Sequence, residues 1–256
     1  MPDSLPLSVV IITRDAARDI AECLACVPFA AEALVVDSGS RDDTVQAARA
    51  CGARVVEHEW LGFGPQKNFA TAAAEHDWVL CVDADERVSP ELARSIRGLF
   101  AAGYPSHRGY AIARRNRFLG RWLAHGEGYP DWNVRLFDRR AGRWSDEPVH
   151  ERVHVDGAVA RLHGDLLHFS GESVESYIDK QNRYTTIQAQ AMHARGEHAS
   201  AARLFLSPFA RFVRFYLLKL GFLDGAAGFA HVAIGAFASF LKYAKLRALD
   251  VAERTR

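Results

Sequence analysis

The sequence lacks an excess of charge of either sign. Its 32 Lys and Arg residues nearly balance its 31 Asp and Glu residues, which leaves a formal net charge of +1. This balance argues against a nucleic-acid binder that works through bulk charge, although it is compatible with local basic patches. Internal repeats and low-complexity linkers are also missing, and 256 residues are enough for one large domain or a domain with an appendage.

Cysteine is scarce, with four residues at positions 23, 26, 51 and 81. Cys23 and Cys26 have the spacing of a redox or zinc-binding pair, but no second pair accompanies them and both fall on an expected amphipathic helix. We therefore predict plain core cysteines. No signal-peptide pattern opens the chain, so we expect a reduced, cytosolic setting.

Strand-like and helix-like segments alternate through the first hundred residues. The apolar patterns predict strands at 7–13, 33–40, 53–58 and 78–85, and helices at 19–27, 41–52, 65–76 and 89–103. The last helix is expected to be capped by Ser89, with Gly103 after its end. Strands that alternate with crossover helices indicate an α/β fold with a mainly parallel sheet flanked by helices.

The rest of the chain is less regular. Residues 104–171 are rich in arginine and tryptophan, with short strand candidates at 109–115, 133–140 and 149–155. A helix is expected at 172–196, followed by two more helices hinged at Asp224-Gly225. We therefore expect three parts, at 1–103, 104–171 and 172–256.

Polar residues gather at the expected carboxyl ends of the strands. Thr13 and Asp15 end the first, Asp37 ends the second, and Asp83 and Asp85 end the fourth. Ligands of open α/β sheets bind at this edge. Two carboxylates spaced i, i+2 suit the binding of Mg²⁺ or Mn²⁺ together with a diphosphate, whereas a lone pair of this kind could equally be a solvated turn.

Four ordered segments decide between these interpretations. The stretches "LSVVIITRDAARDIAECLACV", "ALVVDSGSRDDTVQAARACGARVV", "GFGPQKNFA" and "WVLCVDADERVSPEL" resemble the nucleotide-sugar domain of family 2 glycosyltransferases. The later stretches "GYPDWNVRLFDRRAGRWSDEPVHERV" and "GDLLHFS" narrow the resemblance to bacterial lipopolysaccharide core β-1,4-glucosyltransferases. The resemblance implies a GT-A fold, with a donor-binding part at 1–103 and an acceptor-side part at 104–171.

The resemblance also implies roles for individual residues. Thr13 and Asp15 would contact the nucleotide, although the family more often has Asn at the position of Asp15. Asp37 would bind the uracil ring, Asp83 would lie near the ribose and the metal, and Asp85 would ligate the metal. Lys67, in the motif Gln66-Lys67-Asn68, would offer a cation to base or phosphate, or else be a solvated helix charge. His168 would be a further metal ligand or a structural histidine.

An inverting transfer also needs a carboxylate that takes the proton of the acceptor hydroxyl. Glu151 is our first candidate, because it ends the acidic stretch that resembles the family's base region, and Asp131 is the second. The other candidates are Asp146 and Glu147.

Arginines and aromatic residues crowd residues 114–140. This composition suits a phosphorylated, acidic saccharide such as the lipopolysaccharide inner core, although each arginine taken singly could pair with a nearby acid.

The tail, residues 204–245, carries apolar side chains at helical spacing with basic residues among them. Its uncharged run at 225–241 spans 17 residues, which is short for a membrane span. We expect peripheral binding to the anionic inner face of the cytoplasmic membrane, or packing onto the catalytic domain or a second subunit.

The sequence thus predicts a metal-dependent inverting glycosyltransferase that moves a hexose, expected to be glucose, from a UDP-sugar to the heptose of lipopolysaccharide inner core. The alternatives are a polyprenyl phosphate or another glycan as acceptor, and a non-catalytic nucleotide-sugar binding protein. A nucleotidyltransferase would carry a glycine-rich loop after its first strand, and "IITRDAARDI" contains no glycine.

Overall fold

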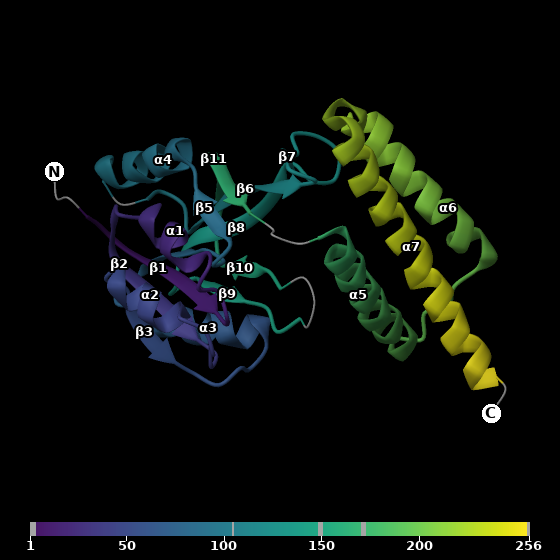
Figure 1. The fold of residues 1–256 in the computed structure, drawn as a ribbon, viewed down its shortest axis with the longest axis horizontal. Coiled ribbons are helices and arrows are strands. Elements are labelled where there is room, and N and C mark those ends of the chain that lie inside the picture. Colours follow the sequence, from purple (N-terminus) through teal and green to yellow (C-terminus); the bar gives the residue numbers. More distant parts are fainter. Residues whose placement is uncertain (1–3, 104, 148–150, 170–172, 255–256) are drawn as a thin grey trace. The chain divides into compact units, whose positions relative to one another are not determined.

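The computed structural model describes residues 4–103, 105–147, 151–169 and 173–254. The chain divides into two compact units (Figure 1). The sheet unit comprises Met1–Arg115 and Asp131–Phe169, and the helical unit comprises Asn116–Pro130 and Ser170–Arg256. The expected three-part division at 103 and 171 stays a prediction, since compactness does not report which part binds which substrate.

The first half of the sheet unit is parallel. Its strands lie in the order β3 (Arg54–Glu57), β2 (Ala30–Asp37), β1 (Leu5–Thr13) and β4 (Trp78–Cys81). The helices α1 (Ile20–Ala25), α2 (Thr44–Ala50) and α3 (Phe63–Ala73) connect them. All seven elements lie within the ranges that the sequence predicts or differ from them by a few residues at the ends. The carboxyl ends of β1, β2 and β4 therefore share one edge of the sheet.

The second half of the sheet continues beyond β4 in the order β8 (Asp131–Asp138), β6 (Gly109–Phe118), β11 (Val159–His168) and β5 (Glu86–Val88). Here β4 pairs antiparallel with β8, β8 with β6, and β11 with β5. Helix α4 (Pro90–Ala101) starts at Ser89, whose side chain accepts a hydrogen bond from Leu92 N as expected for an N-cap.

Two short strands, β9 (Gly142–Trp144) and β10 (Val153–Val155), form a separate antiparallel pair. Of the predicted strand at 149–155 only β10 is found, and residues 149 and 150 lie outside the described part of the chain. The sequence did not suggest β5, β9 or β11.

The strand β1 shows why this sheet is buried on both faces. Leu7, Val9 and Ile11 are fully buried on one face, against residues of α1 and α4, while Val10 packs on the other face with Ala70 of α3. Covering both faces explains the continuous β-branched run in the sequence. The four cysteines are free thiols, and of these Cys23 and Cys81 are buried in the core.

The helical unit contains α5 (Val174–Ala194), α6 (Ala201–Phe212) and α7 (Gly225–Arg254). A π-helical turn, η1 (Val213–Leu218), extends α6, and a short 3-10 turn, η2 (Gly221–Asp224), precedes α7. Leu220 and Gly225 have φ angles of 57° and 62°; Leu220 separates η1 from η2, and Gly225 separates η2 from α7. The hinge predicted at Asp224-Gly225 is therefore confirmed.

The segment 116–130 belongs to the helical unit although its first three residues are the end of β6 and its last residue precedes β8. Its strand β7 (Arg121–Trp122) pairs with the last two residues of β6. The buried Asp224 carboxylate accepts hydrogen bonds from the backbone N–H groups of Ala124 and His125, at 2.9 and 2.8 Å. Glu127 forms an ion pair with Arg211 of α6. Side chains of the C-terminal helices thus hold the backbone of this segment.

Candidate functional site

The ends of β1, β2 and β4 meet at one place. Thr13 pairs with Asp37 in the parallel register of β1 and β2, and the Ser38 N–H donates to the Thr13 carbonyl at 2.9 Å. On the other side of β1, Val82 N donates to Val10 O at 3.1 Å, so the turn that contains Asp83 follows directly. The predicted nucleotide-contacting residues Thr13, Asp37 and Asp83 therefore come from three adjacent strand ends.

The loops after β1 and β2 are bound to each other through two aspartates. The Asp37 carboxylate accepts hydrogen bonds from the N–H groups of Gly39 and Ser40, both at 2.9 Å, and from the Ser40 hydroxyl. Ser40 Oγ in turn accepts from Asp15 N at 2.8 Å, and Asp15 Oδ1 accepts from Arg41 N at 2.7 Å. Asp15 adopts a left-handed backbone with φ of 52°. Both aspartates thus shape the loop edge where a nucleotide would lie.

Lys67 is buried and lies among acids. Its Nζ is 2.9 Å from Glu151 Oε1 and 3.4 Å from Asp83 Oδ1, and it lies 4.5 Å from the centre of the Trp144 ring. The side chain is 8% exposed, so the alternative of a solvated helix charge does not apply. Lys67 therefore joins the turn after β4 to the segment after β9, two places that the sequence separates by many residues.

Helix α3 is held close to β9, and this contact positions Lys67. Asn68 Nδ2 donates to Trp144 O at 2.9 Å, and Asn68 Oδ1 accepts from Trp144 N at 3.0 Å. A Cβ atom on Gly64 would lie 2.0 Å from the Ser145 carbonyl oxygen, so only glycine permits this approach. Gln66 is fully buried, and its Nε2 donates to Ser38 Oγ at 3.0 Å. Each residue of the motif Gln66-Lys67-Asn68 thus has a defined contact.

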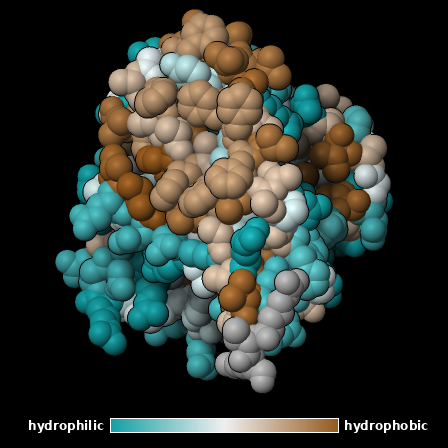
Figure 2. Space-filling view, turned by 90° about the vertical axis from the view of Figure 1, so that its right-hand side faces the viewer, coloured by the Kyte–Doolittle hydropathy of each residue, from teal (hydrophilic) through white to brown (hydrophobic). Residues whose placement is uncertain are grey.

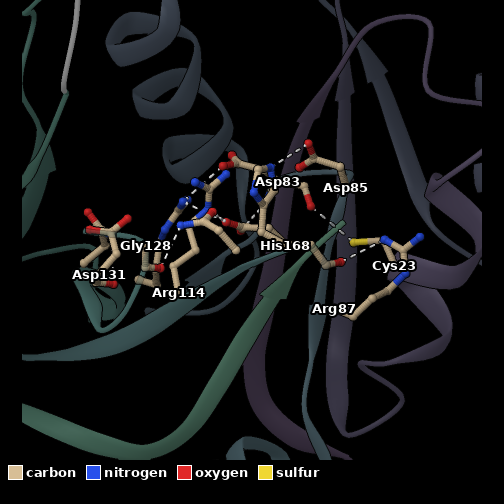
Figure 3. Close-up of polar contacts among 12 residues, drawn as sticks. Cys23, Asp83, Asp85, Arg87, Arg114, Gly128, Asp131 and His168 are labelled. Atoms are coloured by element: carbon tan, nitrogen blue, oxygen red, sulfur yellow. Dashed lines mark hydrogen bonds and ion pairs between the residues drawn. The ribbon is translucent and has the colours of Figure 1, made fainter. Parts of the chain in front are cut away.

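Asp83 is held by a buried network of charges (Figure 3). Arg135 Nη2 donates to Asp83 Oδ2 at 3.0 Å and to Glu86 Oε1 at 3.2 Å. Arg114 Nε donates to the same Glu86 oxygen at 2.6 Å, and Glu86 Oε2 accepts from Asp83 N at 3.0 Å. Burial would raise the pKa of Asp83, but the charges of Arg135 and Lys67 hold it well below its usual value. Asp83 is therefore ionised at neutral pH.

Sequence reasoning missed Glu86 and Arg135. Glu86 has no exposed surface, and Arg135 is buried on β8. One signal could have found Arg135, because an arginine within the apolar strand sequence "NVRLF" needs a buried acid as partner. Arg135 therefore pairs with nearby acids, as the alternative for single arginines states, but it does so in the interior and not on the surface.

Asp85 and His168 are the pair most suited to a divalent cation. His168 Nε2 lies 3.1 Å from Asp85 Oδ2, and the Phe169 N–H donates to the Asp85 carbonyl at 2.9 Å. Burial opposes ionisation of Asp85, yet the contact with His168 lowers its pKa, which leaves a carboxylate ready to bind a cation. The Asp85 side chain is 42% exposed and can therefore be reached from solvent. A hard carboxylate with an adjacent imidazole fits Mn²⁺ or Mg²⁺. The Asp83 carboxylate, in contrast, is already paired with the side chains of Arg135 and Lys67.

The candidate bases lie in different surroundings. Glu151 contacts Lys67 and so belongs to the strand-end site, while Asp146 and Glu147 are exposed. Asp131 lies at the start of β8, opposite Arg114 in the register with β6. Four residues along the same strand separate it from Arg135, which corresponds to about 13 Å, and Figure 3 draws it apart from Asp83 and Asp85.

A second cluster of acids is structural. Among the described residues, Glu32, Glu75 and His76 form the one group of three such side chains close enough to share a metal ion. Glu32 already accepts hydrogen bonds from Ser8, from Arg54 and from the Glu75 N–H, and His76 contacts Ser8 at 3.1 Å. The hydrogen bonds of the Glu32 carboxylate are therefore made within the protein, without a metal ion.

Comparison with solved structures supports the fold. A mannosyltransferase of Pyrobaculum calidifontis, solved in complex with GDP-mannose and Mn²⁺, superposes with a TM-score of 0.53. The superposition covers 96% of this chain and 86% of that chain at 17% sequence identity. The mixed α/β architecture is therefore of the GT-A type, as the sequence predicts, with a long C-terminal helix.

Sequence comparison gives the family. A lipopolysaccharide core biosynthesis glycosyltransferase, LpsC of Rhizobium meliloti, is 31% identical over 253 residues, which cover 96% of this chain and 93% of that protein. An uncharacterized glycosyltransferase of Rickettsia typhi is 32% identical over 97% of this chain and 89% of its own length. Residues 8–160 match the model of glycosyl transferase family 2. This chain therefore belongs to glycosyl transferase family 2 and is a glycosyltransferase.

Proposed function

We propose that this glycosyltransferase transfers glucose from UDP-glucose, with inversion, to the heptose of lipopolysaccharide inner core. The observation that carries the proposal is the meeting of Asp83, Lys67 and Glu151 at the ends of the parallel strands, beside the pair of Asp85 and His168. A donor site, a cation site and a base then lie together, as group transfer requires.

The donor side has a division of roles. Thr13, Asp15 and Asp37 line the loops where the nucleoside would bind, and the buried Thr13 hydroxyl has no hydrogen-bond partner within the described structure. Asp83, fixed by Arg135 and Lys67, would accept hydrogen bonds from the ribose hydroxyls. Lys67 would place its charge near the diphosphate, because its ammonium lies between the two acids.

Asp85 and His168 would hold a divalent cation, Mg²⁺ or Mn²⁺, with Asp83 nearby. When bound, this ion supplies positive charge that offsets the charge on the leaving UDP. The contact with His168 lowers the pKa of Asp85, so its carboxylate is ionised, and His168 would join it as a ligand only after losing the hydrogen on Nε2.

Glu151 would act as the base. Its carboxylate takes the proton of the acceptor hydroxyl while that oxygen attacks the anomeric carbon, opposite the leaving diphosphate. The contact of Lys67 with Glu151 Oε1 orients the carboxylate at 2.9 Å. Asp131 is the second candidate, although it lies farther along β8.

The acceptor assignment rests on the likeness to LpsC, whose printed name concerns lipopolysaccharide core. We propose that residues 1–103 bind the donor, that 104–171 bind the acceptor, and that the enzyme acts as a peripheral protein at the cytoplasmic face of the inner membrane. Residues 172–256 would supply the membrane contact.

Calorimetric titration with UDP, with and without Mn²⁺, tests the donor site. We expect binding that depends on Mn²⁺ and that Asp85→Asn abolishes. Asp77→Asn is the matched control, because its side chain is 41% exposed and precedes β4 rather than following it. Metal-independent UDP binding, or an undiminished affinity in Asp85→Asn, would remove the cation site from the proposal.

The acceptor is tested separately with radiolabelled UDP-glucose. We expect label on a core oligosaccharide that ends in heptose and none on polyprenyl phosphate. Glu151→Gln should abolish transfer while UDP still binds, since the base is not needed for donor binding. Equal transfer to polyprenyl phosphate would favour the alternative acceptor.

A further inference from the structure

We infer that the turn between α6 and α7 inserts into the surface of an anionic lipid bilayer. The turn and its flanks expose large apolar side chains at a density unusual for a soluble surface. We call five of them the apolar tip: Leu217, Leu218, Leu220, Phe222 and Leu223. Leu218 is 74% exposed. Figure 2 shows a broad apolar area on the face that carries these helices.

Aromatic side chains extend the tip along both helices. Phe205 and Phe209 of α6 are 68% and 66% exposed, and Phe229 of α7 is half exposed. Phe209 and Phe229 lie about two turns from the tip on their helices and extend its apolar surface, whereas Phe205 lies more than three turns away. Burial of such side chains drives interfacial binding of helices that do not span a membrane.

The charge around the tip favours an anionic partner. Arg214 and Lys219 are exposed at the end of the helices that carries the tip, and the acid of this turn is Asp224. That acid is buried and occupied by the N–H groups of Ala124 and His125. Arg211 is paired with Glu127, and Lys242, Lys245 and Arg247 lie toward the other end of α7. Lys219 is exposed within the tip itself, where its ammonium would meet lipid phosphates.

The other end of α7 is polar, and this limits the depth of insertion. Residues Gly221–Glu253 are long and apolar enough to cross a membrane, with a mean hydropathy of 1.3 over the most apolar window. However, Lys245 Nζ donates to Asn182 O and to the hydroxyls of Thr185 and Thr186, and Asp250 accepts from the Ala199 N–H. These polar contacts are made with α5 and with the segment before α6, where hydrocarbon would not be tolerated. Only the apolar tip and the adjoining ends of α6 and α7 therefore enter the lipid.

The identity of the membrane rests on the proposed function, whereas the apolar tip is a feature of the helical unit itself. The inference assigns a lipid-binding role to the tip. A second copy of the chain is the other occupant that such a surface could take, but the exposed cations Arg214 and Lys219 of two facing tips would repel each other.

Sedimentation of the full chain with sucrose-loaded vesicles tests the inference. We expect strong binding to phosphatidylcholine vesicles that contain about 30% phosphatidylglycerol and weak binding to phosphatidylcholine alone. The double variant Leu218→Asp/Phe222→Asp should lose at least about tenfold in partition coefficient. Val251→Asp is the matched control, because Val251 is 55% exposed at the opposite end of α7 and should leave binding unchanged.

Lys219→Glu tests the charge. Each basic residue near an anionic surface contributes about fivefold in binding, so reversal of one charge should cost about tenfold or more at low salt and less at high salt. UDP titration of the same variants reports whether the sheet unit is intact. Lost vesicle binding with retained UDP binding in the tip variants is the expected pattern.

Three results would overturn the inference. One is equal binding of the tip variants and wild type to anionic vesicles. Another is wild-type chain that resists extraction from vesicles at alkaline pH, which would indicate a spanning helix. The third is a wild-type dimer in light scattering that becomes monomeric in the tip variants, which would indicate that a second copy of the chain binds the tip. If wild type binds vesicles but not UDP, the proposed function fails and the lipid surface stands.

Discussion

Replacement of the fully buried Glu86 by glutamine should destabilise the enzyme. Glu86 Oε1 accepts hydrogen bonds from both Arg114 and Arg135, and Oε2 accepts from Asp83 N. Glutamine keeps one acceptor oxygen, so its amide group must face either two guanidinium donors or the Asp83 N–H. The two arginines also lose half of the negative charge that Asp83 and Glu86 supply.

The expected cost follows from these contacts. Loss of two charge-assisted hydrogen bonds, partly offset by the remaining oxygen, corresponds to about 3 kcal/mol in the free energy of unfolding. For a chain of this size each kcal/mol lowers the melting temperature by about 2–4 °C, so we expect a decrease of about 10 °C. Thermal unfolding followed by circular dichroism measures this shift. UDP affinity should fall as well, because the Asp83 turn loses its anchor.

Glu91→Gln is the matched control. Glu91 pairs with Arg94 on the exposed surface of α4 at 2.9 Å, and such pairs contribute less than about 1 kcal/mol. If Glu86→Gln melts within about 2 °C of Glu91→Gln, the buried network does not stabilise the site and our account of Asp83 is wrong.

Three further predictions concern neighbouring contacts. Gly64→Ala should cost about 2 kcal/mol or more in urea unfolding, because its Cβ would lie 2.0 Å from Ser145 O, whereas Gly98→Ala, with open space around it, should stabilise the exposed helix α4 by about 0.5–1 kcal/mol. Lys67→Met should reduce the transfer rate about 100-fold without lowering the melting temperature of the helical unit, and equal rates would exclude Lys67 from the site. Hydrogen bonds from Arg140 lower the pKa of buried Asp138 to about 2, so its stabilising contribution is complete above pH 4 and is lost as the pH falls toward 2. The difference in unfolding free energy between wild type and Asp138→Asn should therefore shrink by about 1 kcal/mol between pH 6 and pH 3, and a constant difference would contradict the ion pair.

The parallel half of the sheet could be predicted because its signals are local. Apolar strands, helix spacing and the Ser89 cap lie within short windows, and the site residues Thr13, Asp37, Asp83 and Asp85 follow those strands directly. The resemblance to family 2 glycosyltransferases added the roles that the proposed function assigns to these residues.

The antiparallel half could not be predicted in the same way. His168 reaches Asp85 because β11 pairs with β5 in a register that places His168 opposite Glu86, and no local pattern specifies that register. Arg135 likewise reaches Asp83 through the pairing of β4 with β8. Long-range strand pairing thus brings the charged residues together. The sequence shows which charged residues are present but does not predict which of them are in contact.

The hydrogen bonds of Asp224 to Ala124 and His125 bear on how this protein can be divided or recombined. The segment 116–130, which includes the end of β6 and leads to β8, depends on a carboxylate that the chain supplies about a hundred positions later. A truncation after residue 169 would leave those N–H groups without their acceptor. Chimaeras with related enzymes should therefore exchange residues 116–130 and the C-terminal helices together, because neither is an independent module.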